Sequence, residues 1–169
     1  MTTPSAIKSL FKYKAWANKE LFAALQAIDA VRYANEFQNA LRILNHIHVV
    51  DRIFKAHLLR LPHAYKATNT QDTPSLAALA AAVAEVDAWF VEYGGTLDSA
   101  ALAEVIKFTF TDGDLGAMSR EEILVHVTTH GGYHRGAVGQ LLRSMGAVPP
   151  RDLYTRFLHD AEPKRRASP

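Results

Sequence analysis

The stretch His126-Val-Thr-Thr-His130-Gly-Gly-Tyr-His134-Arg135-Gly136 places three of the chain's eight histidines four residues apart. On an α-helix, a step of four residues turns about 40° around the axis and rises about 6 Å. Neighbouring histidines at this spacing can bind one metal ion, as in zinc sites that take two ligands from one helical turn. All three span about 12 Å, too far for a single ion. The pairs His126/His130 and His130/His134 fit equally well, and His130 belongs to both.

Two glycines, Gly131 and Gly132, lie inside this predicted helix. Each costs up to about 1 kcal/mol relative to alanine in a helix interior, which favours a close approach by a neighbouring backbone or a bound group. A lone histidine on an apolar face is more often a hydrogen-bonded core residue than a ligand. Two histidines at this spacing beside two glycines instead favour a metal site, and Arg135 could hold an anionic substrate group near the ion. The pattern Gly132-x-x-x-Gly136 also suits tight helix packing, as in a dimer.

Outward from this stretch, apolar residues at helical spacing predict further helices. We expect long helices over residues 4–28, 36–61, 73–95 and 119–146, and a short one over 152–160. The signals that begin and end them are Thr3-Pro4, Pro62, Thr73-Pro74, Gly94-Gly95, the capping box Ser119-Arg-Glu-Glu122 and Pro149-Pro150. Residues 105–117 alternate instead and contain Asp112-Gly113, which indicates a β-hairpin or an extended connector.

A third ligand must come from elsewhere, and the second predicted helix carries three candidates, His46, His48 and His57. His46 borders the apolar face of that helix. His48 points about 200° away from His46, and His57 shares the face of His46 but lies about 16 Å along the axis. Only one of the three can join a given site, and the spacing does not say which.

The first predicted helix has two polar residues, Lys14 and Asn18, on its apolar stripe. They lie at an opening of the bundle, are hydrogen-bonded within it, or mark a stretch of the stripe that is exposed. The spacing leaves these three interpretations open.

Composition narrows the class of protein. The chain has 169 residues, 49% of them hydrophobic and 21% charged, which suits one globular domain over residues 1–160 with a tail over 161–169. A net charge of +2 without a basic stripe argues against a nucleic-acid partner. The sequence shows no apolar run long enough to span a membrane and no signal peptide, so we expect a cytoplasmic protein. Because the chain has no cysteine, it offers no disulfide, thiolate ligand or sulfur nucleophile of its own.

Four segments resemble the DinB-like (YfiT-like) family of metal-dependent enzymes, which is unrelated to the DNA polymerase of similar name. They are, in order, Phe11–Asn18, Leu44-Asn45-His46 through Phe54, His126-x-x-x-His130-x-x-x-His134-Arg135-Gly136, and Pro149-Pro150 with Asp152-Leu153. The resemblance covers most of the chain. It departs from the family's pattern at Gly131-Gly132-Tyr133, which replaces a more polar stretch, and at Ala137, where glutamine is common.

The resemblance implies an all-α fold, a four-helix bundle connected up-down-down-up, with the hairpin as an insertion between the third and fourth helices. It implies a divalent ion, zinc or nickel, held by His46, His130 and His134, with His126 as a neighbour of the site. It also implies that two copies of the chain form a homodimer.

Characterised members of the family include metal-dependent thiol transferases and a mycothiol-dependent isomerase. Our leading hypothesis is therefore an enzyme whose metal ion activates a low-molecular-weight thiol, with the thiolate attacking a small electrophilic substrate. Arg135, together with Lys14 or Asn18, would orient carboxylates of the thiol. The alternatives are a hydrolase with a metal-bound water, and a stress-response protein in which the ion clamps the helices without catalysis.

Overall fold

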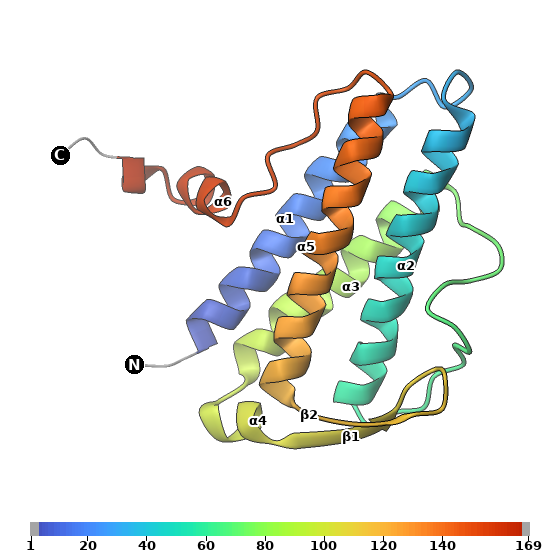
Figure 1. Cartoon of the computed structure of the whole chain (residues 1–169). Coiled ribbons are helices and arrows are strands. Elements are labelled where there is room, and N and C mark those ends of the chain that lie inside the picture. Colours follow the sequence, from blue (N-terminus) through green and yellow to red (C-terminus); the bar gives the residue numbers. More distant parts are fainter. Residues whose placement is uncertain (1–3, 167–169) are drawn as a thin grey trace.

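The structure, a computed structural model, describes residues 4–166 and is mostly helical with one small sheet (Figure 1). The helices are α1 (Pro4–Gln26), α2 (Ala34–Leu58), α3 (Leu76–Thr96), α4 (Ser99–Ala103), α5 (Arg120–Ser144), α6 (Tyr154–Ala161) and the 3₁₀ helix η1 (Pro163–Arg166). The strands are β1 (Val105–Thr109) and β2 (Leu115–Ser119). The predicted mostly helical class is confirmed.

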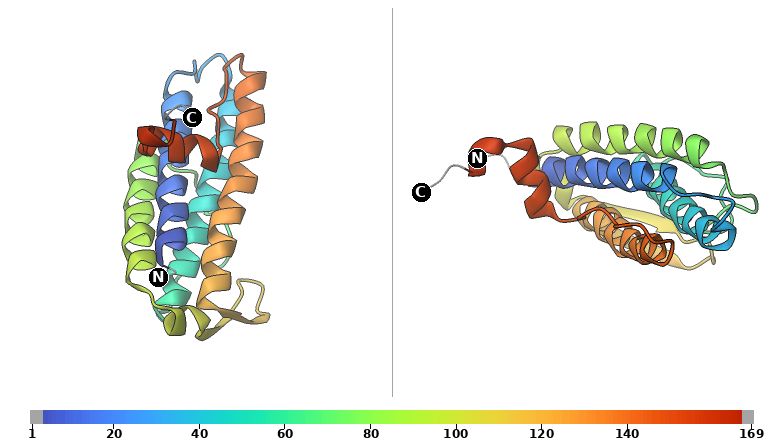
Figure 2. Two further views of the ribbon diagram at one scale, coloured as in Figure 1. Left: turned by 90° about the vertical axis from the view of Figure 1, so that its left-hand side faces the viewer. Right: turned by 90° about the horizontal axis from the view of Figure 1, so that it is seen from above.

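The four long helices lie side by side, with α1 packed on α3 and α2 packed on α5 (Figures 1 and 2). Helices α1 and α5 run in one direction, and α2 and α3 run in the opposite direction (Figure 1). Because α2 and α3 run the same way, the connection between them, residues 59–75, has to return along the length of α2. This returning segment contacts the candidate site through the backbone carbonyl of Thr68.

The apolar core consists of two clusters at different heights of the bundle. One lies toward the hairpin and includes Phe11 stacked on Phe90, with ring centroids 4.8 Å apart. The other lies toward the opposite end and includes Leu25, Leu44 and Leu142. On α1 and α5, the polar side chains of the candidate site lie between the residues of the two clusters, whereas on α2 and α3 they alternate with cluster residues.

The hairpin between α3 and α5 is antiparallel, as predicted, and its register pairs Phe108 with Gly116. A Cβ atom at Gly116 would lie 2.6 Å from the Phe108 ring, so only glycine fits opposite that side chain. Gly113, with φ of +99°, turns the chain between the strands. Helix α5 then begins with the predicted capping box of Ser119 and Glu122.

Several predicted helix ends are displaced by local chemistry. Helix α3 begins at Leu76, because Ser75 is its N-cap and accepts a hydrogen bond from the Ala78 amide at 3.3 Å; Thr73-Pro74 precedes the cap. Helix α2 ends at Leu58, since Arg60 adopts a φ of +56° and the Leu61 amide turns back to the Ala56 carbonyl.

Gly94 and Gly95 lie inside α3, which the sequence had predicted them to end. A Cβ at Gly94 would come within 3.1 Å of the Ile7 side chain on α1. The glycine at this position therefore serves close packing of two helices.

Within residues 4–166, no helix combines the length and the apolar character needed to cross a membrane. The predicted tail over 161–169 includes η1, and its last three residues lie outside the described part of the chain. The division into a domain over 1–160 and a tail stays a prediction.

Candidate metal site

Helices α2 and α5 bring together the three histidines that the resemblance singled out. His46 comes from the middle of α2, and His130 and His134 come from successive turns of α5. One ring nitrogen from each histidine lies within 4.8 Å of the other two. The closest pair is Nε2 of His46 and Nε2 of His130, 3.0 Å apart. The packing of α2 on α5 thus places a third histidine beside the α5 pair.

The hydrogen bond at Nδ1 of His46 fixes the tautomer of its ring. Nδ1 of His46 lies 2.7 Å from the backbone carbonyl oxygen of Thr68. A carbonyl can only accept, so Nδ1 must carry the proton and donate it. In the neutral imidazole this leaves the lone pair of Nε2 free and directed toward His130.

Burial keeps the imidazoles of α5 neutral. Burial, together with the neighbouring rings of His134, His46 and His126, lowers the pKa of His130 to about 3. Burial also lowers the pKa of His134, with a further contribution from His46. Since neutral imidazole is the form that binds metal, burial favours the metal-binding form of both rings.

The donor set fits a divalent transition-metal ion. With metal–nitrogen distances of about 2.0–2.1 Å, tetrahedral ligand atoms lie roughly 3.3 Å apart, close to the spacing of the His46–His130 pair. Nδ1 of His130 is buried without a hydrogen-bond partner among the described protein atoms, unlike Nδ1 of His46, which donates to Thr68. Three imidazoles leave one or more coordination positions for water or substrate.

The remaining candidate histidines lie outside this group. The His126 ring packs against Phe54, with centroids 4.8 Å apart, and lies 5.4 Å from the His130 ring. His57 stacks on Phe108 of the hairpin, and burial lowers its pKa to about 4. His48 is buried away from the site, with its pKa also lowered to about 4 by burial. The geometry therefore selects His46 among the three candidates of α2.

A family model for the DinB family matches residues 1–166 of the chain. The chain belongs to the DinB family. No curated protein and no solved structure matches it significantly. The family assignment confirms the resemblance seen in the sequence, and the three-histidine cluster is compatible with a metal-binding member of this family.

Close to the histidines, this DinB-family chain buries a charged network in the middle of the bundle. Nζ of Lys14 lies 2.6 Å from a carboxylate oxygen of Asp51 and 2.6 Å from one of Asp87. Asn18 donates to the other oxygen of Asp87 at 2.7 Å. Of the interpretations open for Lys14 and Asn18, the structure supports hydrogen bonding within the bundle. The partner residues Asp51 and Asp87 were missed in the sequence. Each lies at helical spacing within an apolar stripe, Asp51 between Ile47 and Phe54 and Asp87 between Val83 and Phe90, and this position could have marked them as buried.

Opposing forces set the charges of this network. Burial alone would lower the pKa of Lys14, but the two carboxylates outweigh burial and raise it. Burial raises the pKa of Asp51 to about 6 despite the opposing effect of Lys14. The network therefore holds a lysine that stays charged near the site, with one carboxyl that titrates in the weakly acidic range.

Gly131 is explained by the network. A Cβ atom there would lie 3.1 Å from Nη1 of Arg135 and 3.5 Å from Cε of Lys14. The glycine between the two ligand positions of α5 thus makes room for two buried cations. Gly136 differs, because a Cβ there would meet nothing within 4 Å.

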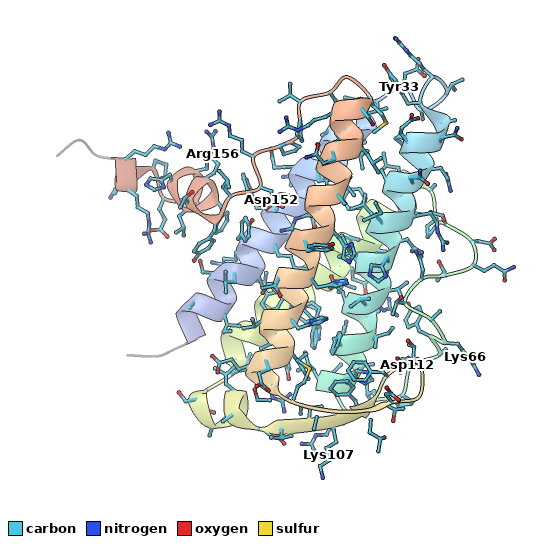
Figure 3. All side chains as sticks on the ribbon, in the orientation of Figure 1. Tyr33, Lys66, Lys107, Asp112, Asp152 and Arg156 are labelled. Carbon is cyan, nitrogen blue, oxygen red and sulfur yellow. The ribbon has the colours of Figure 1, made fainter. Side chains whose placement is uncertain are left out.

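Arg135 is buried, at 3% exposed, and its guanidinium is turned toward α1 and the C-terminal segment. Nε lies 2.7 Å from Asp152, which also accepts a hydrogen bond from the Tyr13 hydroxyl. Figure 3 shows Asp152 where the C-terminal segment meets the bundle. The predicted role of Arg135 in orienting a substrate stays a prediction, and a substrate carboxylate would have to compete with Asp152.

Proposed function

We propose that this chain is a divalent-metal-dependent enzyme that binds zinc or nickel through His46, His130 and His134. The observation that carries the proposal is the convergence of three imidazoles from two helices within 4.8 Å. The neutral state of His130, whose pKa is lowered to about 3, supports the same assignment. A closed structural zinc site takes four protein ligands, whereas three ligands are typical of catalytic sites.

The reaction we propose is transfer of a low-molecular-weight thiol to a small electrophile. A bound divalent ion lowers the pKa of a coordinated thiol and so supplies a thiolate near neutral pH. The chain has no cysteine, so the sulfur has to arrive with the thiol. The protein's own part is to hold three neutral imidazoles in place and to keep the charged network on the bundle side of the site.

Metal content and turnover test this proposal together. Purified protein should contain about one zinc or nickel per chain by elemental analysis, and His130→Ala should lose it. The matched control is His159→Ala, which removes a half-buried histidine of α6 whose Nδ1 contacts the Thr155 carbonyl of its own helix. Stoichiometric metal in His130→Ala would contradict the site assignment.

Turnover distinguishes the three candidate activities. Metal-loaded protein is mixed with an electrophile such as a chlorodinitrobenzene, with and without a panel of small thiols. Consumption that requires the thiol supports transfer. Consumption without thiol would instead show a hydrolase that uses metal-bound water. A melting temperature that rises on metal binding, without any turnover, would show a non-catalytic metal-binding protein, which is the stress-response alternative.

We also propose that the four long helices form the up-down-down-up bundle of the family and that two copies pair through the outer face of α5. Val125, Tyr133 and Gly136 fall within about 80° of one another around that helix. Tyr133 is 79% exposed and Val125 is 44% exposed. Because the Tyr133 ring also lies 5.1 Å from the His134 ring, a partner there would border the site. Sedimentation should show a dimer that Tyr133→Lys dissociates; an unchanged dimer would place the interface elsewhere.

A further inference from the structure

The connection between α2 and α3 reaches the metal site through one backbone group. The carbonyl of Thr68 accepts the hydrogen bond from Nδ1 of His46 at 2.7 Å. Because this bond places the proton on Nδ1, it decides which nitrogen of His46 faces the other ligands. The orientation of His46 on α2 thus depends on a residue that lies 22 positions later in the sequence.

That segment has no regular secondary structure, so its position depends on side-chain anchors. Asn45, the residue before the ligand, is 1% exposed and donates through Nδ2 to Oδ1 of Asn69 and, at 2.6 Å, to Oγ1 of Thr70. Nδ2 of Asn69 donates to the Arg42 carbonyl at 3.0 Å. Nη1 of Arg42 in turn donates to the Thr70 carbonyl at 2.6 Å.

The orientation of the Asn69 amide follows from its neighbours. The Thr70 amide can only donate, and it lies 3.0 Å from Oδ1 of Asn69. The Arg42 carbonyl can only accept, so it must face Nδ2. Oδ1 of Asn69 is therefore an acceptor for Asn45, and the amide cannot flip without breaking these bonds.

We propose that Asn45, Asn69 and Thr70 are positioning residues of the metal site. They fix residues 68–70 against α2, so that the Thr68 carbonyl holds His46 in the tautomer whose Nε2 is free to bind metal. The metal-affinity part of this inference rests on the proposed function, whereas the tautomer part concerns the metal-free protein alone.

The first experiment measures the tautomer of His46 in metal-free protein by ¹⁵N NMR of the histidine rings, with His46→Gln to assign the signals. In the unaltered chain, His46 should be protonated on Nδ1. In Asn69→Ala and Thr70→Val, the Thr68 carbonyl is released and His46 should show a mixture of tautomers. Thr70→Ser keeps the hydroxyl that accepts from Asn45 and should behave like the unaltered chain.

The second experiment measures affinity for Co²⁺ and Zn²⁺ by titration, using the visible spectrum of the cobalt protein as a report on ligand geometry. Loss of an outer partner of a metal-binding histidine weakens affinity by about 10- to 100-fold. We expect a loss of this size in Asn69→Ala and Thr70→Val, with a changed cobalt spectrum, and affinity within about twofold of the unaltered chain in Thr70→Ser.

The matched control is Ser75→Ala, at the end of the same connection. It removes the N-cap of α3 and costs about 1 kcal/mol, without a contact to residues 68–70 through its hydroxyl. It should lower the melting temperature and leave both the tautomer and the affinity unchanged. An Nδ1-protonated His46 in both Asn69→Ala and Thr70→Val would overturn the inference. Equal effects of Thr70→Ser and Thr70→Val would also overturn it. Absence of metal binding in the unaltered chain would instead contradict the proposed function, and the tautomer result would still decide this inference.

Discussion

Lys14 is expected to contribute strongly to the free energy of unfolding, because it lies at the centre of a buried charged network. Its ammonium is 2.6 Å from both Asp51 and Asp87, and all three side chains are almost completely buried. Replacing Lys14 by methionine keeps the volume but leaves two buried carboxyls without their cation. Loss of one partner from a buried ion pair costs about 3–5 kcal/mol. Urea unfolding should show a loss of this size, whereas the exposed neighbour change Lys12→Met should stay within about 0.5 kcal/mol. Similar losses in both variants would show that the network contributes little.

The two glycines on opposite sides of α5 make a second prediction. Gly131→Ala places a methyl group 3.1 Å from an Arg135 nitrogen that Asp152 and Asn18 hold in place. Overpacking of this kind costs about 1–3 kcal/mol, which exceeds alanine's gain in helix propensity. Gly136→Ala has open space and should stabilise the monomeric chain by up to about 1 kcal/mol. Thermal unfolding at low protein concentration measures both, and a stabilising Gly131→Ala would contradict the packing described.

Among the elements, α6 depends on one carboxylate for its attachment. Asp152 binds Arg135 and Tyr13, and the following helix adds the Tyr154 hydroxyl to Ser9 at 2.8 Å. Asp152→Ala leaves the buried guanidinium without its anion, at a cost of about 1–3 kcal/mol. We expect faster hydrogen exchange in residues 154–161 and no change in α2. The control is Asp160→Ala, which breaks an exposed pair with Arg156 and should leave exchange at α1 unaltered. Equal exchange in α6 of Asp152→Ala and the unaltered chain would show that α6 is held without Asp152, through the Tyr154–Ser9 hydrogen bond and apolar packing.

The helices could be predicted because each long helix repeats its apolar residues at the helical period. Their ends could not be placed as well, since Ser75, Arg60 and Gly94 act through local bonds or through packing with a distant helix. The spacing of residues 126–136 predicted two ligands. The choice of His46 required either the family resemblance or the observed packing of α2 on α5, because a helical wheel carries no information about which neighbour a face meets.

The position of Asp51 and Asp87 on the apolar stripes of their helices indicates burial, as it does for Lys14 and Asn18. Their pairing could not be predicted, because Lys14 is 37 and 73 residues away from them along the chain. The contact of Thr68 with His46 is equally non-local, since it depends on how an irregular segment returns along α2. The sequence thus indicates which polar residues are buried, whereas their partners become visible only when the helices are assembled.

At the scale of the whole molecule, the buried histidines predict how stability depends on pH. Folding lowers the pKa of His48 and His57 to about 4 and that of His130 to about 3, from an ordinary value of 6.5. Between these values the unfolded chain binds protons that the folded chain does not, so stability falls as the pH drops from about 6.5 toward 4. Asp51, raised to about 6, has the opposite effect over roughly pH 4–6, but three histidines outweigh it.

Urea midpoints at pH 7, 6 and 5 with a chelator present measure this dependence. His57→Phe should flatten it, because the replacement keeps the stacking on Phe108 and removes one titrating group. His159→Phe, at a half-buried position on α6, should leave the slope unchanged. Stability that rises on acidification would mean that Asp51 dominates.

The separation of the three histidines along the sequence has a consequence during synthesis of the protein. His46 and His130 are 84 positions apart, and synthesis proceeds from the N-terminus. While the ribosome is still making α3, only His46 of the three histidines has been synthesised. Thr68, whose carbonyl orients the His46 ring, precedes α3 and has also been synthesised. An ion can be captured by all three only once α5 has left the ribosome and docked on α2. A chain truncated before α5 would then lack two of the three imidazoles and could not form the three-histidine cluster.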